Sequence, residues 1–507
     1  MREEITLLST PQTYFTRYPI ASKVLNSNLR RDGRFKVHTV DDISLICYSK
    51  SVKALEDKYK PILNSIDTPY SHYARIWAGG TPISRFSIFY TYTGIFDEYI
   101  LSKIPTRDIL CTAYTILDFR LVKTLLNDNR RVMLGGSSTF IYEPELIRKF
   151  MIEMGVKRDK VENNLIIVRG YVDLTTDLYS IYKNWKDYVI TNNDFSTMWD
   201  CTEDNLTEKV NIYNKLFHTG LNALLTSKCW WGKCKFCTYN CFPKHNFAEN
   251  VEVEKIVNYF KKISKSYKST NVFFNDSYLE NNDYNKKLFK RLTEEGFTKS
   301  LYTGVLLLKR PDYIDFLNQN KVASVLVGVE TTIDSSLKFI NKGYTRKDLF
   351  EMVNMLKKRL NKHTVPNILL MCDLPLNAPN RKEAIRQIRE GYQILVDIRQ
   401  DLAAAGIGNG AGCQFSLAPL RHFPKTDLAD GKLLKIESFN KKIDELVGIV
   451  PMYKYLGETL NIDIRDIINA KCLSEPIMRY LPNGEPLESD ANFLDKETII
   501  ELGTWRE

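Results

Sequence analysis

The chain has 507 residues, of which 44% are hydrophobic and 26% are charged, and this composition excludes a disordered or collagen-like protein. Lys and Arg number 71 against 61 Asp and Glu, a net charge of +10 that favours anionic partners or cofactors without requiring nucleic acid. At about 100–200 residues per domain, the length predicts two to four domains with complete hydrophobic cores.

The sequence lacks the signals of export or membrane insertion. No stretch reaches the roughly 18 consecutive apolar residues of a membrane helix. Residues 1–4 are followed by a strand-like Ile5 to Leu8 instead of the apolar core of a signal peptide. We therefore expect a cytoplasmic protein without membrane contact, in which the ten cysteines are mostly reduced thiols.

The first part of the chain alternates apolar runs with helical patterns, which predicts an α/β fold with a parallel sheet. The predicted strands are Ile5–Leu8, Ile43–Cys47, Asp108–Tyr114, Val132–Leu134 and Leu165–Val168. The fourth strand runs into Gly135, Gly136 and Ser137, before a predicted helix over Pro144–Met154. Such a turn lets a ligand approach the backbone at the carboxyl end of a strand. A purely structural pair of glycines is the alternative.

A polar stretch, Asn192–Lys209, has the composition of a linker, and a second alternating region follows it. Its predicted strands are Leu221–Thr226, Asn271–Asn275, Leu301–Leu307, Ala323–Val329, Asn367–Met371 and Gln414–Ala418. Six strand–helix units predict a partial (β/α)6 barrel of the TIM type. We therefore expect an N-terminal α/β domain over residues 1–200, a barrel over 210–430 and a mainly helical C-terminal cap over 431–507.

Four of the ten cysteines fall in one short segment directly after the first barrel strand. Four residues separate Cys229 from Cys234, two separate Cys234 from Cys237, and Cys241 follows. Three thiolates on one loop can hold three irons of a four-iron cluster and leave the fourth iron open to a ligand. A zinc site usually has two ligand pairs a dozen or more residues apart, and the ferredoxin pattern needs a cysteine where Trp231 stands. Both remain alternatives.

This segment resembles the cluster motif of the radical S-adenosylmethionine superfamily, although the usual spacing is three residues and then two. Phe236, before the third cysteine, matches the aromatic residue that lies near the adenine in that family. Three further positions match: Asp276 after the second barrel strand, Glu330 in Val327-Gly328-Val329-Glu330, and Lys342 in Asn341-Lys342-Gly343. The resemblance implies that Asp276 binds the methionyl amino group, Glu330 the ribose or methionine end, and Lys342 the carboxylate. Asp373 stands where the family has glycine after the fifth strand.

The first region is similar to the flavodoxin-like, or Rossmann-like, cobalamin-binding domain that precedes the barrel in one branch of this superfamily. That resemblance places the cofactor near Thr112, Tyr114 and the Gly135-Gly136-Ser137 turn. The motif that supplies a cobalt-binding histidine is absent, as in most of the branch. A degenerate domain that binds nothing is the alternative.

The resemblance implies a cobalamin-dependent methyltransferase that uses a [4Fe-4S] cluster and S-adenosylmethionine to make a 5'-deoxyadenosyl radical and methylate an unactivated carbon. The expected partners are a peptide or small-molecule substrate and a reducing protein such as flavodoxin or ferredoxin. The resemblance of Trp230 and Trp231 to a peptide-modifying branch slightly favours a peptide as the predicted substrate. The alternatives are a cobalamin-independent radical enzyme for cyclisation, rearrangement or RNA modification, and an iron–sulfur or zinc binding module. Catalytic residues, and the roles of Cys241 and His422, stay unassigned.

Overall fold

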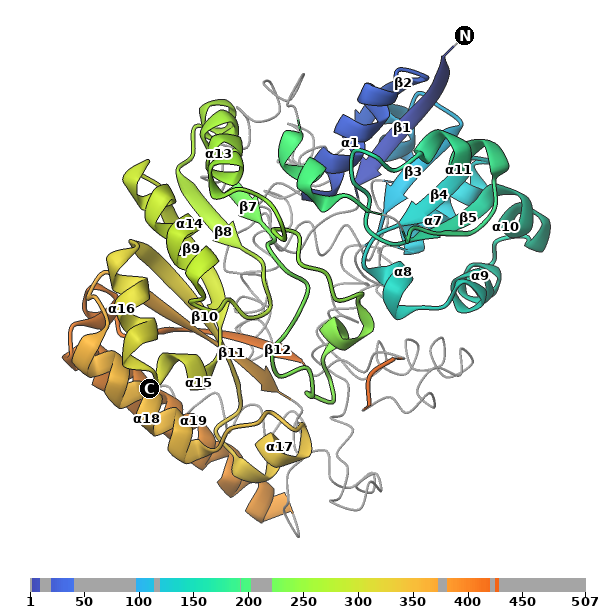
Figure 1. The fold of residues 1–507 in the computed structure, drawn as a ribbon. Helices are drawn as coiled ribbons and strands as arrows, with labels where there is room; N and C mark the ends of the chain where they lie inside the picture. The colour runs from blue at the N-terminus through green and yellow to red at the C-terminus, as the bar shows by residue number, and fades with distance from the viewer. Residues whose placement is uncertain are drawn as a thin grey trace.

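The protein contains two parallel α/β regions joined in one chain (Figure 1). The computed structural model describes residues 2–9, 20–40, 97–113, 119–191, 193–201, 221–372, 381–419 and 425–427. Each region has a six-stranded sheet within these residues. In this part of the chain, no helix has both the length and the apolar character that crossing a membrane requires.

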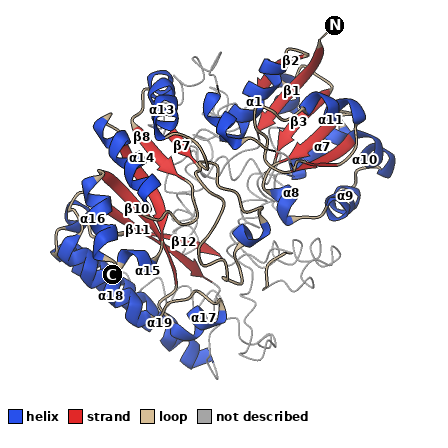
Figure 2. Cartoon of the chain, viewed as in Figure 1, coloured by secondary structure: helices blue, strands red, loops and turns tan. Residues whose placement is uncertain are grey.

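The first sheet has the strand order β2-β1-β3-β4-β5-β6, and all of its neighbouring strands pair in parallel. Figure 2 shows its strands among the surrounding helices. Its strands are β1 (Glu3–Ser9), β2 (Phe35–Val40), β3 (Asp108–Thr112), β4 (Arg131–Gly135), β5 (Leu165–Arg169) and β6 (Tyr188–Val189). The order reverses between β1 and β3, as in flavodoxin-like folds, which bind ligands beyond the carboxyl ends of the strands at this point. The flavodoxin-like prediction is confirmed.

Helices cover both faces of this sheet, so alternate residues of a strand enter different cores. They are α1 (Ile20–Asp32), α6 (Asp97–Lys103), α7 (Phe119–Asn127), α8 (Ser138–Ile141), α9 (Pro144–Glu153), α10 (Arg158–Asn164) and α11 (Leu178–Asn184). In β3, Ile109 and Cys111 pack with Leu125 of α7, whereas Leu110 packs with Leu29 of α1. Burial on both faces explains the continuous apolar runs of the central strands.

The second sheet has the sequential order β12-β11-β10-β9-β8-β7, again with parallel pairing throughout. Its strands are β7 (Leu221–Ala223), β8 (Asn271–Phe274), β9 (Thr298–Thr303), β10 (Val322–Glu330), β11 (Val365–Cys372) and β12 (Gln414–Pro419). Within the described residues β7 and β12 are the edges of the sheet, so the barrel is open. The predicted partial (β/α)6 barrel is confirmed.

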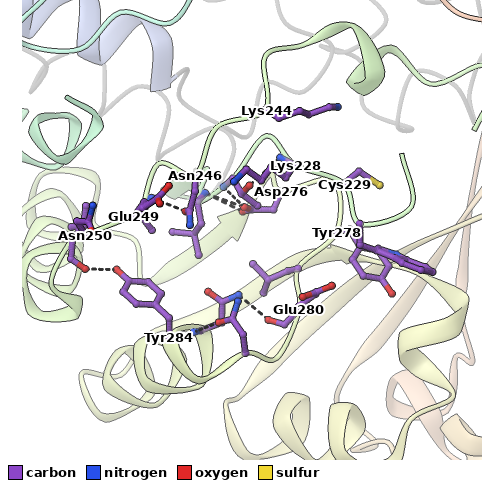
Figure 3. A pocket seen from close by; sticks show the side chains of 18 residues that line it. Lys228, Cys229, Lys244, Asn246, Glu249, Asn250, Asp276, Tyr278, Glu280 and Tyr284 are labelled. Carbon is purple, nitrogen blue, oxygen red and sulfur yellow. Dashed lines mark hydrogen bonds between the residues drawn. The ribbon is translucent and has the colours of Figure 1, made fainter. Parts of the chain in front are cut away.

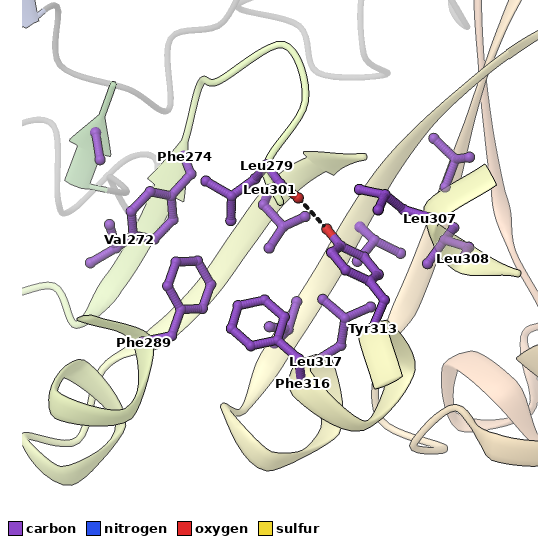
Figure 4. Close-up of a cluster of buried hydrophobic side chains, with 14 of the residues drawn as sticks. Val272, Phe274, Leu279, Phe289, Leu301, Leu307, Leu308, Tyr313, Phe316 and Leu317 are labelled. Atoms are coloured by element: carbon purple, nitrogen blue, oxygen red, sulfur yellow. Dashed lines mark hydrogen bonds between the residues drawn. The ribbon is translucent and has the colours of Figure 1, made fainter. Parts of the chain in front are cut away.

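Helices pack on the outer face of the barrel sheet. They are α13 (Val253–Tyr267), α14 (Asp283–Glu294), α15 (Val305–Leu308), α16 (Pro311–Gln319), α17 (Asp334–Phe339), α18 (Arg346–Arg359) and α19 (Arg381–Ala404). The chain also forms the 3-10 helices η2 (Phe195–Asp200), η3 (Thr238–Cys241) and η4 (Ile407–Gly410), of which η3 lies in the loop after β7. Val272, Phe274 and Leu301 of the strands meet Phe289 and Phe316 of the helices in one apolar layer (Figure 4). The other face of the sheet stays available to line the barrel interior.

Two predictions from the sequence need correction. The strand predicted over Leu301–Leu307 ends at Thr303, because Gly304 begins α15 and the apolar run over residues 305–308 is helical. Such short apolar runs fit strands and helices equally well. The predicted linker contains η2, whose Trp199 is buried in the barrel core and donates its indole N–H to the Phe247 carbonyl at 3.0 Å.

Several other predictions are not tested. The strand predicted over Ile43–Cys47 and the cap over 431–507 lie outside the described residues. The domain boundaries at residues 200, 210 and 430 stay predictions. The structure adds β2 and β6, which lie at the two edges of the first sheet and which the apolar pattern did not indicate.

Candidate active site

The loop that carries the clustered cysteines leaves the carboxyl end of β7 and ends in η3. This is the end of the sheet at which α/β barrels place their chemistry. Cys229, Cys234 and Cys237 are half-buried free thiols within the loop. The amide of Cys237 donates to the carbonyl of Cys234 at 3.1 Å, so the residues between them form a turn. The predicted cluster ligands therefore share one short loop near the surface.

Contacts with the segment after α17 hold the cysteine loop in place. The Trp231 indole N–H donates to the Asn341 carbonyl at 2.7 Å, and the Asn341 side-chain amide donates to the Lys233 carbonyl at 3.0 Å. Gly343 has a φ of +79°, and a Cβ at this position would lie 2.6 Å from the Trp231 ring. The Asn-Lys-Gly sequence therefore has a structural role, which is to anchor the loop.

A buried ion pair lies beside this loop. Lys342 Nζ and Glu330 Oε1 are 2.6 Å apart, and the two side chains are 17% and 10% exposed. Glu330 ends β10 with a φ of +64°, a left-handed conformation that is uncommon outside glycine. A Cβ on Gly328 would lie 2.8 Å from Glu330 Oε1 and 3.0 Å from Lys342 Nζ. The glycine of the Gly-x-Glu motif therefore makes room for the ion pair.

Burial and charge act against each other at the thiols. Burial raises the pKa of Cys234 to about 12 and also raises the pKa of Cys237, whereas the nearby Lys342 ammonium lowers both. Burial lowers the pKa of Lys342, but the Glu330 carboxylate and Cys234 outweigh this effect and the pKa is raised overall. Lys342 is therefore a stable cation beside thiols that a metal must deprotonate in order to bind.

Asp276 follows β8 and is fully buried. Its Oδ1 accepts hydrogen bonds from the amides of Thr226 and Leu225 at 2.6 and 3.0 Å, and Oδ2 lies 3.3 Å from the Leu225 amide. Burial raises the pKa of Asp276 to about 7, although these backbone hydrogen bonds lower it. The carboxyl group therefore fixes the start of the cysteine loop, and Oδ2 retains acceptor capacity for a ligand.

The predicted cofactor residues of the barrel form two neighbouring groups around the cysteine loop. Phe236 packs against Ile340, and the centre of its ring is 5.5 Å from Lys342 Nζ, so it lies with the ion pair. Asp276 and Cys229 instead line a pocket of about 840 Å³ with Trp230 (Figure 3). The other lining residues are Leu225, Thr226, Lys228, Lys244, Asn246, Ala248, Glu249, Asn250, Val251, Tyr278, Leu279, Glu280, Asn282, Tyr284 and Asn285.

The glycine turn of the first region lies at the carboxyl end of β4. Gly136 has a φ of +100°, and a Cβ there would lie 2.4 Å from the Ala113 carbonyl oxygen. At Gly135 the nearest atom to an added Cβ is the Val168 carbonyl oxygen at 3.6 Å, an ordinary contact. The fold therefore requires glycine at position 136, whereas a Cβ at position 135 would make only an ordinary contact.

The residues around this turn are tied together by backbone contacts. The Ala113 amide donates to the Gly135 carbonyl at 2.8 Å, and the amide and hydroxyl of Ser138 donate to the Ala113 carbonyl at 3.1 and 2.9 Å. Thr112, the last residue of β3, is buried beside Gly135 in the sheet register, and Ser137 precedes α8. The structure thus brings together four of the five predicted residues, and Tyr114 lies outside the described residues.

The glycine turn and the cysteine loop meet where α8 contacts η3. Phe140 of α8 and Phe242, which follows η3, have ring centres 5.5 Å apart. Phe242 also contacts Tyr239, whose hydroxyl donates to the Asn275 carbonyl beyond β8 at 3.1 Å. Sequence reasoning missed these aromatic residues, because no spacing pattern links side chains about 100 positions apart. The only available signal was the aromatic composition next to each predicted loop.

A second aromatic contact lies nearby. Tyr171 beyond β5 packs edge-on against Phe247 and His245, with ring centres 5.0 and 5.5 Å apart. Lys425, beyond β12, forms an ion pair with Glu143 at the start of α9, and Arg169 pairs with the same carboxylate at 2.9 Å. The contact between the two regions therefore has both an apolar and a charged part.

The residues present fit a cluster better than a single metal ion. Among the residues that the structure describes, no group of three or more His, Cys, Asp and Glu side chains could hold one metal ion. A zinc ion collects its ligands around one centre at about 2.0–2.3 Å. The cysteines of a four-iron cluster need no such common centre, and the thiols of Cys234 and Cys237 lie near the Lys342 cation, which favours an anionic group.

Residues 224–378, which begin directly after β7 and end shortly beyond β11, match the family model of the Radical SAM superfamily. The barrel is a radical SAM domain. The protein is therefore an enzyme of the radical S-adenosylmethionine type, and such enzymes use a [4Fe-4S] cluster together with S-adenosylmethionine. No curated protein matches the sequence.

Solved structures with some likeness to this chain include a radical S-adenosylmethionine methyltransferase, TsrM from Kitasatospora setae, with cobalamin and a [4Fe-4S] cluster bound. It is 12% identical with a TM-score of 0.47, and the match covers 89% of this chain and 76% of that chain. The cobalamin-dependent radical enzyme OxsB is 14% identical with a TM-score of 0.43, over 87% of this chain and 56% of OxsB. Methylornithine synthase (PylB) is 14% identical with a TM-score of 0.30, over 62% and 92%.

Of three residues to which the sequence analysis assigned no role, the structure describes one. Cys241 ends η3, and its Sγ lies 3.5 Å from the Lys425 carbonyl oxygen, so it faces the segment beyond β12. Burial raises the pKa of its thiol. His422 and Asp373 lie outside the described residues.

Proposed function

We propose that the protein is a cobalamin-dependent radical methyltransferase. The observation that carries this proposal is the contact of α8 with η3, because the two helices directly follow the glycine turn and the cysteine loop. A radical SAM domain and a flavodoxin-like domain therefore present their candidate cofactor loops to one interface. The proposal requires this arrangement, since a methyl group must reach the carbon at which the radical is formed.

In this proposal, Cys229, Cys234 and Cys237 hold the [4Fe-4S] cluster. Lys342 binds the carboxylate of S-adenosylmethionine and Asp276 its ammonium, through Oδ2. The Lys342 ammonium has three donors, so it can keep Glu330 and accept a second anion. Phe236, in contact with Lys342, offers an apolar face to the adenine.

Glu330 has two tasks in the proposed site. It neutralises Lys342 in the absence of ligand, and its remaining acceptor sites can bind the ribose hydroxyls. With all groups bound, the cofactors supply a 5'-deoxyadenosyl radical and a methyl group. The chain itself binds and orients the two ends of S-adenosylmethionine and excludes water from the carboxyl face of the barrel.

The proposed cobalamin site is made mainly of backbone. Gly135 supports it, because among the described residues a Cβ there would make only an ordinary contact, 3.6 Å from the Val168 carbonyl oxygen, and the absence of a side chain lets a flat ligand approach the backbone. The substrate we propose is an unactivated carbon of a peptide or natural product. The adjacent Trp230 and Trp231 offer aromatic surface near the pocket beside Cys229.

A radical SAM enzyme without functional cobalamin is the second candidate. The observation that favours it concerns Gly136. Its φ of +100° and its close approach to Ala113 are enough to require glycine at this position. One of the two glycines in the turn is therefore explained by the fold alone, without a ligand. Under this alternative the first region is a structural domain, and the barrel performs cyclisation, rearrangement or RNA modification.

Substitution of Glu330 tests the barrel part of the proposal. We expect Glu330→Gln to reduce S-adenosylmethionine binding at least about tenfold, since it removes both the negative charge beside Lys342 and an acceptor. Glu294→Gln is the matched control, because Glu294 is an exposed carboxylate on α14, outside the pocket, where it pairs with Arg291. Binding is measured by equilibrium dialysis with radiolabelled S-adenosylmethionine. Equal binding by wild type and Glu330→Gln would refute the assigned role.

A further inference from the structure

The cysteine loop is fixed at two places by different contacts. In its first half, the Trp231 indole donates to the Asn341 carbonyl at 2.7 Å. At its end, the hydroxyl of Tyr239 in η3 donates to the Asn275 carbonyl at 3.1 Å. The amide of Asn275 in turn donates to the carbonyl of Ala223, the last residue of β7, at 2.8 Å. Tyr239 therefore ties the end of the loop to the carboxyl ends of β7 and β8.

Two predicted cluster ligands lie in the turns directly before Tyr239. The Cys237 amide donates to the Cys234 carbonyl at 3.1 Å, and the Asn240 amide donates to the Cys237 carbonyl at 3.2 Å. The Asn240 side-chain amide also donates to the Cys234 carbonyl at 3.2 Å. Residues 234–240 are therefore one hydrogen-bonded unit, and a displacement of Tyr239 would move the backbone that carries Cys234 and Cys237.

The same tyrosine is connected to the glycine turn through two phenylalanines. The ring centre of Phe242 lies 5.6 Å from that of Tyr239 and 5.5 Å from that of Phe140 in α8. The neighbour of Phe140 in α8, Thr139, donates its hydroxyl to the Gly136 carbonyl at 2.8 Å. We call Phe140, Phe242 and Tyr239 the aromatic link, because these three rings join the glycine turn to the cysteine loop.

We propose that Tyr239 and Phe242 are positioning residues that couple cofactor binding at the cysteine loop to cofactor binding at the glycine turn. This inference rests on the proposed function, because coupling requires both cofactors. When three thiols are tied to one cluster, the loop loses conformational freedom and Phe242 is restrained against Phe140. A ligand at the glycine turn then meets an α8 that is already ordered, so less conformational entropy is lost when it binds. By linkage, the effect on the two affinities is reciprocal.

Another aromatic contact between the two regions provides a matched control. Phe195 of η2 packs on Phe247 and on Tyr171 of the first region, with ring centres 4.8 and 6.2 Å apart. Within the described residues, Phe195 has no ring contact with any member of the aromatic link. A substitution of Phe195 therefore removes a ring from the contact between the regions without breaking the link.

The test compares the hydroxocobalamin affinity of the full-length protein before and after anaerobic reconstitution of the cluster. Affinity is measured by equilibrium dialysis. We expect the cluster to tighten binding to wild type at least about fivefold. Phe242→Leu keeps an apolar side chain but loses both ring contacts of the link, so we expect this ratio to fall below about twofold. Phe195→Leu should keep the wild-type ratio.

Tyr239→Phe tests the hydroxyl separately from the ring. This variant keeps the ring beside Phe242 and loses the hydrogen bond to Asn275, so the turn with the cysteines is no longer tied to β8. We expect about four irons per chain, as in wild type, because the three thiols remain. We also expect a lower affinity ratio than in wild type and an altered EPR spectrum of the dithionite-reduced cluster without cobalamin.

Iron content and circular dichroism are measured first for every variant. If Phe242→Leu loses iron or folded structure, Tyr239→Phe provides the test. A wild-type ratio near one would overturn the proposal, as would a ratio that persists in the variants of both positioning residues. An equal loss of the ratio in Phe195→Leu would also overturn it, because the coupling would then not depend on the aromatic link. Absence of cobalamin binding to wild type, with and without the cluster, would instead contradict the proposed function.

Discussion

The cysteine loop of the barrel is held by side chains, whereas the glycine turn of the first region is held by its backbone. Around the cysteine loop, Trp231 and Asn341 form specific hydrogen bonds, and Glu330 pairs with Lys342. Around the glycine turn, amides and carbonyls of β3 and β4 form most of the contacts. The first site therefore depends on residue types, and the second depends on the space that a missing side chain leaves.

Because the cysteine loop depends on residue types, we expect substitution of a cluster cysteine to have the largest effect on cofactor content. We expect Cys234→Ala to lose essentially all cluster iron, because two thiols cannot replace three ligands on one loop. Cys241→Ala is the matched control and should keep the iron, since Cys241 faces the Lys425 carbonyl. Iron and sulfide are measured after anaerobic reconstitution. Iron loss in Cys241→Ala equal to that in Cys234→Ala would show that the ligand set is wrong.

The next effect concerns the buried ion pair. Glu330→Ala leaves the Lys342 ammonium buried without a partner, and we expect it to lower the free energy of unfolding by about 3–5 kcal/mol. The double variant Glu330→Leu/Lys342→Met should recover a large part of this loss, because it removes both charges. Urea unfolding followed by circular dichroism gives the free energies. A double variant no more stable than Glu330→Ala would mean that the carboxylate acts through something other than the pair.

Substitutions at Gly135 and Gly136 test the other half of the comparison, the glycine turn. Gly136→Ala should destabilise the first region by at least about 2 kcal/mol, because alanine meets both a positive φ and the Ala113 carbonyl. Gly135→Ala should change stability by less than about 0.5 kcal/mol, since its Cβ would make only an ordinary contact with the Val168 carbonyl oxygen, and yet it should weaken retention of hydroxocobalamin at the proposed site. Stability is read by urea unfolding, and retention by absorbance after gel filtration. Full cobalamin retention by Gly135→Ala would remove the support that this position gives to the site.

The smallest effect lies at the ion pair between the regions. Lys425, with Arg169, holds the pKa of Glu143 below its usual value near 4.5. The group is ionised in the native state at lower pH than in the unfolded chain, so its contribution is present above about pH 4.5 and is lost as the pH falls through the lowered pKa. Glu143 is 50% exposed, so we expect this contribution to be well under 1 kcal/mol.

The measurement for this pair compares wild type with Glu143→Gln in urea unfolding between pH 7 and pH 3.5. We expect wild type to be more stable by a few tenths of a kcal/mol at pH 7 and the difference to disappear at the acid end. A difference that grew as the pH fell would contradict the assigned direction of the pKa shift.

Sequence reasoning worked where chemistry demands particular residues at a fixed spacing. It placed the cysteines on a loop after the first barrel strand and Glu330 at the end of the fourth, as the structure shows, because a motif and a strand end each leave a local signal. It did not foresee that Glu330 and Lys342 pair directly, or that Gly328 makes the space for them. These facts depend on a bulge in β10 and a left-handed residue, which composition does not encode.

The contact between the regions was beyond sequence reasoning for a different reason. Phe140 and Phe242 meet across about 100 residues, and a single sequence carries no record of such pairs. The edge strand β2 was also missed, because Phe35–Val40 mixes charged and apolar residues, as expected for a strand with one neighbour. The central strands of the first sheet, buried on both faces, were predicted correctly from their apolar runs.

The central claim is that one chain holds two cofactors at loops that meet. The most direct measurement is anaerobic reconstitution with iron, sulfide and hydroxocobalamin, followed by gel filtration and determination of iron and cobalt in the washed protein. The account predicts about four irons and one cobalt per chain. Four irons without cobalt would contradict the cobalamin site and leave a radical SAM enzyme with a structural first domain, and retention of zinc in place of iron would contradict both sites.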